Sequence, residues 1–193
     1  MDLIGSTRLV RRAATVLPLL LSLAACNIAG PDSSPSLTGK WVGSTTVYRN
    51  PHGSSTFLPL NAKLTLTFAK HPTLDSRTQS VTVPGTWSMT FADPAYDRSG
   101  TFSALADRER DCAGGSGASG VCWTEGWMTY VMPIELRSTV PCSSFYGSSS
   151  SGGFYLRDPN ANTMSIFVDN KDDPTCPASG HDHLSGAFNV KRQ

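Results

Sequence analysis

The amino-acid sequence predicts an all-β fold, a small up-and-down antiparallel β-barrel of about eight strands. Residues 64–68 (LTLTF) alternate apolar and polar side chains, and the apolar residues of 79–91 mostly occupy every second position. Alternation with period two, rich in Thr, Val and aromatic residues, is typical of half-buried antiparallel strands. No segment of useful length has the period of a helix.

Turn-forming residues separate these strands. Pro, Gly, Asn and Asp gather at residues 50–53 (NPHG), 93–94 (DP), 158–160 (DPN) and 173–174 (DP), and such clusters mark chain reversals. The strands therefore follow one another as a meander. We expect them at about residues 37–48, 58–69, 79–91, 99–106, 122–136, 153–158, 163–169 and 183–191.

Glycine recurs close before an aromatic residue near the predicted strand starts. Glycine stands two positions before Trp41, Trp87, Phe102 and Phe188, and directly before Trp127. In a strongly coiled sheet, glycine lets a strand bend and leaves space that a neighbouring aromatic ring can cover. The pattern favours a barrel. A two-sheet β-sandwich remains the alternative, because short strands with turn signals fit it as well.

The first residues have the pattern of an export signal. A basic segment with Arg8, Arg11 and Arg12 precedes an apolar run at 13–25, which is too short to span a bilayer. Residues 23–26 (LAAC) resemble the lipobox of bacterial lipoproteins. The resemblance implies cleavage after residue 25 and acylation of Cys26, with palmitate among the expected fatty acids. Several acyl chains together hold a protein on a membrane surface.

The chain thus divides into a signal peptide (1–25), a lipid attachment site with a flexible, proline-bearing spacer (26–36), and one β domain (37–193). Its 16 Lys and Arg nearly balance its 15 Asp and Glu, for a net charge of +1. This balance does not favour nucleic acid as a partner. We expect a monomer that reaches the membrane through its lipid.

Four cysteines remain once Cys26 is assigned to the lipid: Cys112, Cys122, Cys142 and Cys176. An even number in an exported chain predicts two disulfides, and spacing alone leaves all three connectivities open. A zinc site is the competing interpretation. The chain has no C-x-x-C pair, so we predict no metal site at these thiols.

The β domain resembles the lipocalin-like, or calycin-like, bacterial lipoproteins over about residues 37–191. The resemblance rests on the lipobox, on residues 37–41 (LTGKW) in the first strand, and on an eight-strand meander that ends in residues 184–188 (LSGAF). It implies a barrel in the bacterial cell envelope. Asn27, directly after the lipidated cysteine, implies sorting to the outer membrane.

A meander barrel also selects a cysteine pairing. The connections that follow the first, third, fifth and seventh strands gather at one end of the barrel, here called the distal end. The connections that follow the second, fourth and sixth strands gather at the other end, here called the proximal end, where the first strand also starts. Only Cys112–Cys122 with Cys142–Cys176 keeps each bridge at one end, as a short Cα separation requires. The longer connections, at 49–57, 92–98, 137–152 and 170–182, fall at the distal end, which is the expected mouth of an open barrel.

We expect the domain to bind or sequester an apolar small molecule or lipid, since an eight-stranded barrel either fills with side chains or holds one small ligand. A solid core is the alternative structure. A protein-interaction module that contacts an envelope protein through residues 143–153, with Phe145 and Tyr146, is the alternative function. The residues predicted to line a ligand cavity are Trp41, Phe68, Trp87, Met89, Phe91 and Phe188.

Signals for chemistry are weak. Residues 181–183 (HDH) have metal-ligating side chains, but such a loop cluster is more often solvated surface. The serines of 114–120 (GGSGASG) lack the frame of a nucleophile elbow. We therefore predict no cofactor, no metal and no enzymatic activity.

Overall fold

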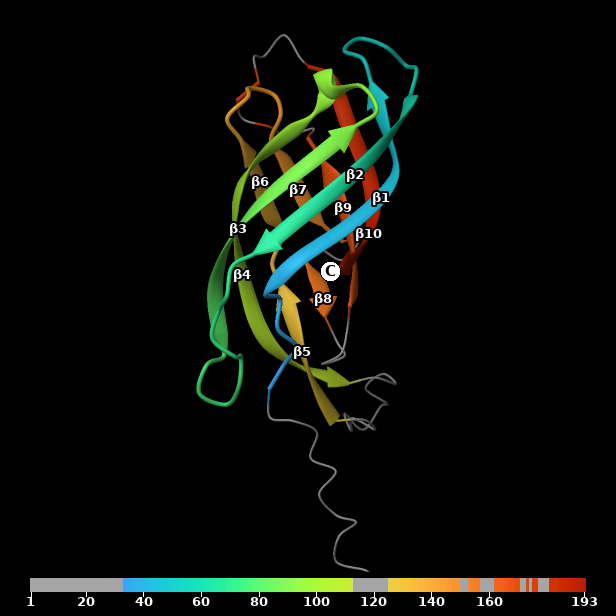
Figure 1. Ribbon diagram of the computed structural model, residues 1–193. Helices are drawn as coiled ribbons and strands as arrows, with labels where there is room; N and C mark the ends of the chain where they lie inside the picture. The colour runs from blue at the N-terminus through green and yellow to red at the C-terminus, as the bar shows by residue number, and fades with distance from the viewer. Residues whose placement is uncertain are drawn as a thin grey trace, which may run out of the picture.

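The computed structural model is almost entirely β, and its core is a closed antiparallel barrel of eight strands with two additional strands (Figure 1). In the part of the chain that the structure describes, the helical structure is one 3-10 turn at Pro94–Tyr96, and no helix there is long and apolar enough to cross a membrane. The strands are β1 (Gly39–Asn50), β2 (Leu58–Phe68), β3 (Ser80–Phe91), β4 (Arg98–Cys112), β5 (Glu125–Val131), β6 (Ile134–Ser138), β7 (Phe145–Ser148), β8 (Phe154–Leu156), β9 (Thr163–Asp169) and β10 (His183–Arg192). The structure describes residues 33–112, 125–149, 153–156, 162–170, 173, 175–176 and 181–193.

The barrel is closed by pairing between β3 and β4. The other strands of the ring follow in the order β3-β2-β1-β10-β9-β7-β6-β4. The two additional strands extend the ring, because β5 pairs with the later part of β4 and β8 pairs with β5. If β5 with β6, and β7 with β8, are each counted as one interrupted strand, neighbours in the ring follow chain order. The predicted meander barrel is therefore confirmed, and the β-sandwich alternative was wrong because the sheet closes on itself.

The strand predicted at 122–136 is interrupted in the structure. It separates into β5 and β6 at Met132 and Pro133, and proline has no N–H for the ladder. The register with β4 shifts by one residue across this break, as it does at a β-bulge. Val131 and Ile134 consequently both face the core although they lie on opposite parities of the sequence.

β7 was not predicted. It lies within 137–152, which the sequence indicates as a loop, and its four residues alternate between buried and less buried positions. Four residues in a serine-rich stretch are too few for a recognisable period. Pairing with β6 on one side and β9 on the other makes this segment a strand.

The inward positions of the strands form one apolar core. In β9, Met164, Ile166 and Val168 are buried, whereas Ser165 and Phe167 between them are exposed. The predicted inward parity of the strands is confirmed. Fully buried aromatic and aliphatic side chains from β1, β2, β3, β6, β7 and β10 meet in this core.

Glycine and aromatic residues are reciprocally paired between β3 and β4. Gly85 lies opposite Phe102, and Trp87 lies opposite Gly100. A Cβ added to Gly85 would lie 2.2 Å from the Phe102 ring. One added to Gly100 would lie 1.7 Å from the backbone carbonyl oxygen of Arg137 and 3.0 Å from the Trp87 indole nitrogen. The Phe102 ring thus occupies the space of the missing Gly85 side chain, as the recurring glycine pattern predicts. Gly100 instead lets the backbone of β6 approach β4 closely, beside the Trp87 ring.

The segment before β1 is docked on the proximal end of the barrel. The Ser34 N–H donates to the carbonyl of Leu74 at 2.9 Å, and the Thr129 hydroxyl donates to the Ser34 hydroxyl at 2.8 Å. Leu37 is fully buried, and its N–H donates to the His71 ring at 3.1 Å. The flexibility predicted for 26–36 therefore does not extend to the described end of that segment.

Replacement of Gly85 by alanine should destabilise the barrel. The new Cβ would collide with the Phe102 ring, and overpacking of this kind costs about 1–3 kcal/mol. Urea denaturation followed by tryptophan fluorescence would measure the loss. The neighbouring surface change Ser103→Ala, opposite Pro84 on the outer face, should alter the free energy of unfolding by less than about 0.5 kcal/mol. Equal stability of the two variants would contradict the packing described above.

Candidate functional site

The residues predicted to line a ligand cavity lie in the packed core. Trp41, Phe68, Trp87, Met89 and Phe188 are each at most 2% exposed, and Phe91 is partly buried. Their neighbours are other core side chains. Phe68 meets Phe102 and Trp87 meets Phe145 edge to face, at centroid distances of 5.0 and 5.6 Å. Aromatic rings therefore fill the part of the interior that these residues surround.

An apolar recess lies instead on the outer wall, across β9 and β10. It has a volume of about 360 Å³, within the roughly 300–1,000 Å³ typical of small-molecule pockets. Phe167, 40% exposed, stands beside Ala187 in the ladder between the two strands. We call this the β9–β10 recess, and its lining residues are Ser149, Ser165, Ile166, Phe167, Ala187, Phe188 and Asn189.

The β9–β10 recess lies beside the end of β7. β7 pairs with β9 only from Tyr146 to Ser148 within the described chain. The earlier part of β9, which carries Ser165 and Ile166, therefore lies beyond the end of β7. Ser149, the residue after β7, forms the rim at this point. The small side chain of Ala187 opposite Phe167 adds to the depth of the recess.

Polar groups at the recess are few and hydrogen-bonded. The Ser165 hydroxyl donates to the side-chain oxygen of Asn189 across the ladder. A mostly apolar concavity with a small number of oriented polar groups is typical of a small-molecule site. Among the predicted ligand residues, Phe188 lines this recess. Phe167 and Ala187 were not predicted. The signal for them was an aromatic residue in 163–169 at a position where the alternation places outward-facing polar side chains.

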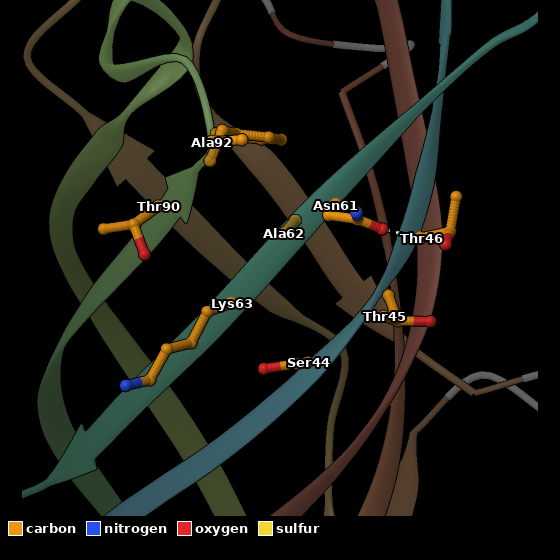
Figure 2. Close-up of a pocket in the computed structure, with 9 residues that line it drawn as sticks. Ser44, Thr45, Thr46, Asn61, Ala62, Lys63, Thr90 and Ala92 are labelled. Carbon is orange, nitrogen blue, oxygen red and sulfur yellow. Dashed lines mark hydrogen bonds between the residues drawn. The ribbon is translucent and has the colours of Figure 1, made fainter.

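A second, polar recess lies on the outer wall of β1, β2 and the end of β3, with a volume of about 480 Å³. Figure 2 shows its hydroxyl, amide and ammonium side chains, with the Thr46 hydroxyl hydrogen-bonded to the side-chain oxygen of Asn61 at 3.4 Å. Most of these side chains are solvent-exposed. The recess is lined by Ser44, Thr45, Thr46, Asn61, Ala62, Lys63, Thr90, Phe91 and Ala92.

Ion pairs and hydrogen bonds join the loops of the distal end. Asp182 forms a salt bridge with Arg49 and accepts the backbone N–H of His52 at 3.1 Å. Burial alone would raise the pKa of Asp182, but the hydrogen bonds from Arg49 and His52 outweigh it and hold the pKa below its ordinary value. His183 bonds to Asp169 at 2.7 Å. The predicted 181–183 cluster is thus an internal part of the loop network.

A second carboxylate organises the loop after β6. Asp173 is buried and accepts the Ser144 N–H at 2.8 Å and the Thr175 hydroxyl at 2.7 Å. Burial would raise the pKa of Asp173, and these hydrogen bonds lower it below the ordinary value. The network also holds Cys142, whose N–H donates to the Thr175 hydroxyl at 2.9 Å.

The structure contains the predicted disulfide between Cys142 and Cys176, with Cα atoms 4.6 Å apart. It links the β6–β7 and β9–β10 loops, and closure of its 34-residue separation stabilises the fold by about 3–4 kcal/mol in the chain-entropy model. Cys112 ends β4 opposite Glu125 in the ladder. Its predicted partner Cys122, together with Cys26 and the serines of 114–120, lies outside the described residues, so the second disulfide stays a prediction.

Comparison of the chain with known protein families, characterised proteins and solved structures found no match.

Acid should weaken the distal end through Asp182. Because the pKa of Asp182 is lowered in the fold, its stabilising contribution is complete above the ordinary value of 3.8 and is lost as the pH falls through the folded value. The variant Asp182→Asn should therefore be less stable than the parent at pH 7, and the difference should shrink below about pH 4. Urea denaturation at several pH values would measure it, with Asp107→Asn at the proximal end as the control. A difference that does not change with pH would contradict this role.

Proposed function

We propose that this protein is a lipid-anchored, non-catalytic binding protein of the bacterial cell envelope, and that it binds a small apolar molecule or lipid in the β9–β10 recess. The observation that carries the binding proposal is the recess itself, with its apolar floor and polar rim. Burial of an apolar group against Phe167 and Ala187 would remove exposed apolar surface from water, at roughly 25 cal/mol per Å².

The closed barrel and the position of the first strand support the anchoring proposal. Ser34 is fixed at the proximal end, so the segment from Cys26 to Ser34 is the whole of the tether. Fully extended, a tether of this length spans no more than about 30 Å. A lipid on Cys26 would therefore hold the proximal end close to the bilayer, with the distal end outward. The lipobox pattern and Asn27 favour the outer membrane.

The barrel wall also supports one alternative, an interaction with another envelope protein. Tyr146 on β7 and Phe167 on β9 are both 40% exposed on neighbouring strands. Phe145, the other aromatic residue expected to contact a partner, is buried against Trp87. Tyr146 is therefore the residue of the predicted interaction segment that remains available to a partner.

Anchoring can be tested by replacement of Cys26. The full-length chain, expressed in a bacterium that processes lipoproteins, should sediment with membranes and incorporate labelled palmitate. Cys26→Ser should incorporate none and should move to the soluble fraction, because the thiol is the acylation site. Membrane sedimentation that survives the substitution would contradict a lipid anchor at Cys26.

Ligand binding can be tested with the neutral fluorescent probe N-phenyl-1-naphthylamine. Phe167→Ser removes the apolar wall of the recess, and Ala187→Trp fills the recess. Each variant should weaken probe binding by roughly tenfold or more, because burial of an aromatic side chain contributes about 1.5–3 kcal/mol. Leu105→Ser is the matched control, because Leu105 is also 40% exposed but lies on β4, across the ring.

Equal probe affinity in all three variants would exclude the β9–β10 recess as the site. Absence of probe binding to the parent protein would overturn the small-molecule proposal and favour the protein-interaction alternative.

A further inference from the structure

The distal end brings three metal-ligating groups together. One ring nitrogen of His181 and the sulfur atoms of Cys142 and Cys176 all lie within 4.8 Å of one another, at partly buried positions. Cys176 and His181 lie five residues apart in one loop, whereas Cys142 lies 34 residues before Cys176, and no C-x-x-C spacing indicates the group. The disulfide and the loop network place them at one point.

We propose that reduction of the Cys142–Cys176 disulfide converts this point into a zinc site, with the two thiolates and His181 as ligands. The proposal does not depend on the proposed function. In the oxidised protein the disulfide joins the two loops. In the reduced protein a zinc ion would join the same loops.

The spacing of the three groups fits tetrahedral zinc. With Zn–S bonds of about 2.3 Å, two thiolate sulfurs in a tetrahedral site lie about 3.8 Å apart. Because the Cα atoms of Cys142 and Cys176 are only 4.6 Å apart, rotation of the side chains can bring the reduced sulfurs to this separation. Three protein ligands leave the fourth position for water, as in open zinc sites.

A hydrogen bond to one ring nitrogen of His181 leaves the other ring nitrogen for a metal. The His181 Nε2 lies 3.0 Å from the carbonyl oxygen of Asn170, so the neutral ring donates its proton there and keeps a lone pair on Nδ1. Zinc-binding histidines almost always donate their second ring N–H to a carbonyl or carboxylate, which fixes the ring. Asn170 is itself held by a hydrogen bond from the Leu184 N–H to its side-chain oxygen at 2.7 Å.

The local electrostatics favour a cation. The carboxylates of Asp173 and Asp182 both lie close enough to His181 to interact with its charge. Both accept the backbone hydrogen bonds described above. Arg49 already neutralises Asp182 in part, which leaves Asp173 as the main source of negative potential beside the site.

The chemistry balances with a dithiol as the reductant. The dithiol gives two electrons and two protons to the disulfide, so that the S–S bond breaks and Cys142 and Cys176 become thiols, while the reductant closes its own disulfide. Zinc binding then displaces one proton from each thiol and forms two Zn–S bonds and one Zn–N bond.

Cobalt(II) can serve as the spectroscopic probe, followed by competition with zinc. The parent is the full-length chain with Cys26, Cys112 and Cys122 changed to serine, reduced with a dithiol that is then removed without oxygen. We expect one cobalt per chain, with the thiolate charge-transfer and visible bands of a tetrahedral site, and loss of these bands when zinc is added. The oxidised parent should show neither band.

The histidine ligand is tested by a matched pair of variants. His181→Gln should weaken metal affinity by roughly tenfold or more, since even the loss of a supporting group around a zinc site costs 10–100-fold. His183→Gln should leave affinity unchanged, because the His183 ring faces Asp169. Near-ultraviolet circular dichroism would confirm that both variants are folded. Equal affinity of the two variants, or absence of thiolate bands in the reduced parent, would overturn the proposal.

Discussion

The reciprocal packing of glycine and aromatic residues between β3 and β4 is the constraint on which the barrel depends. These are the strands whose pairing closes the ring, and a small barrel closes only if its strands coil strongly. Gly85 and Gly100 allow that curvature. The Phe102 ring fills the space that Gly85 leaves, and the Arg137 backbone lies against Gly100 beside Trp87. The same rings then occupy the interior, so the recesses described above lie on the outer wall.

Interruptions in two strands produce the local features that matter for binding. The break at Met132 and Pro133 shifts the register against β4 and keeps both β5 and β6 facing the core. The break after Ser148 ends β7 beside β9 and leaves the β9–β10 recess at its edge.

The two ends of the barrel are held by different means. At the proximal end, Leu37 and Ser34 dock the segment before β1 by burial and hydrogen bonds. At the distal end, the Cys142–Cys176 disulfide and the carboxylates of Asp173 and Asp182 join loops that are far apart in the sequence. A proximal lipid and a distal redox-sensitive metal site would therefore act at opposite ends of one rigid body.

The sequence by itself determined the all-β class, the meander, the inward parity and the Cys142–Cys176 pairing, because period-two alternation and turn residues are local signals and the meander order decides which loops meet. It could not determine β7 or the outward recess at Phe167 and Ala187, although Pro133 is a local signal for the split at Met132. Those features follow from register and from which strand ends beside which neighbour, and such pairing leaves little trace in a single segment. The approach of His181 to the two cysteines has the same origin, since the orientation of its ring depends on the hydrogen bond to Asn170.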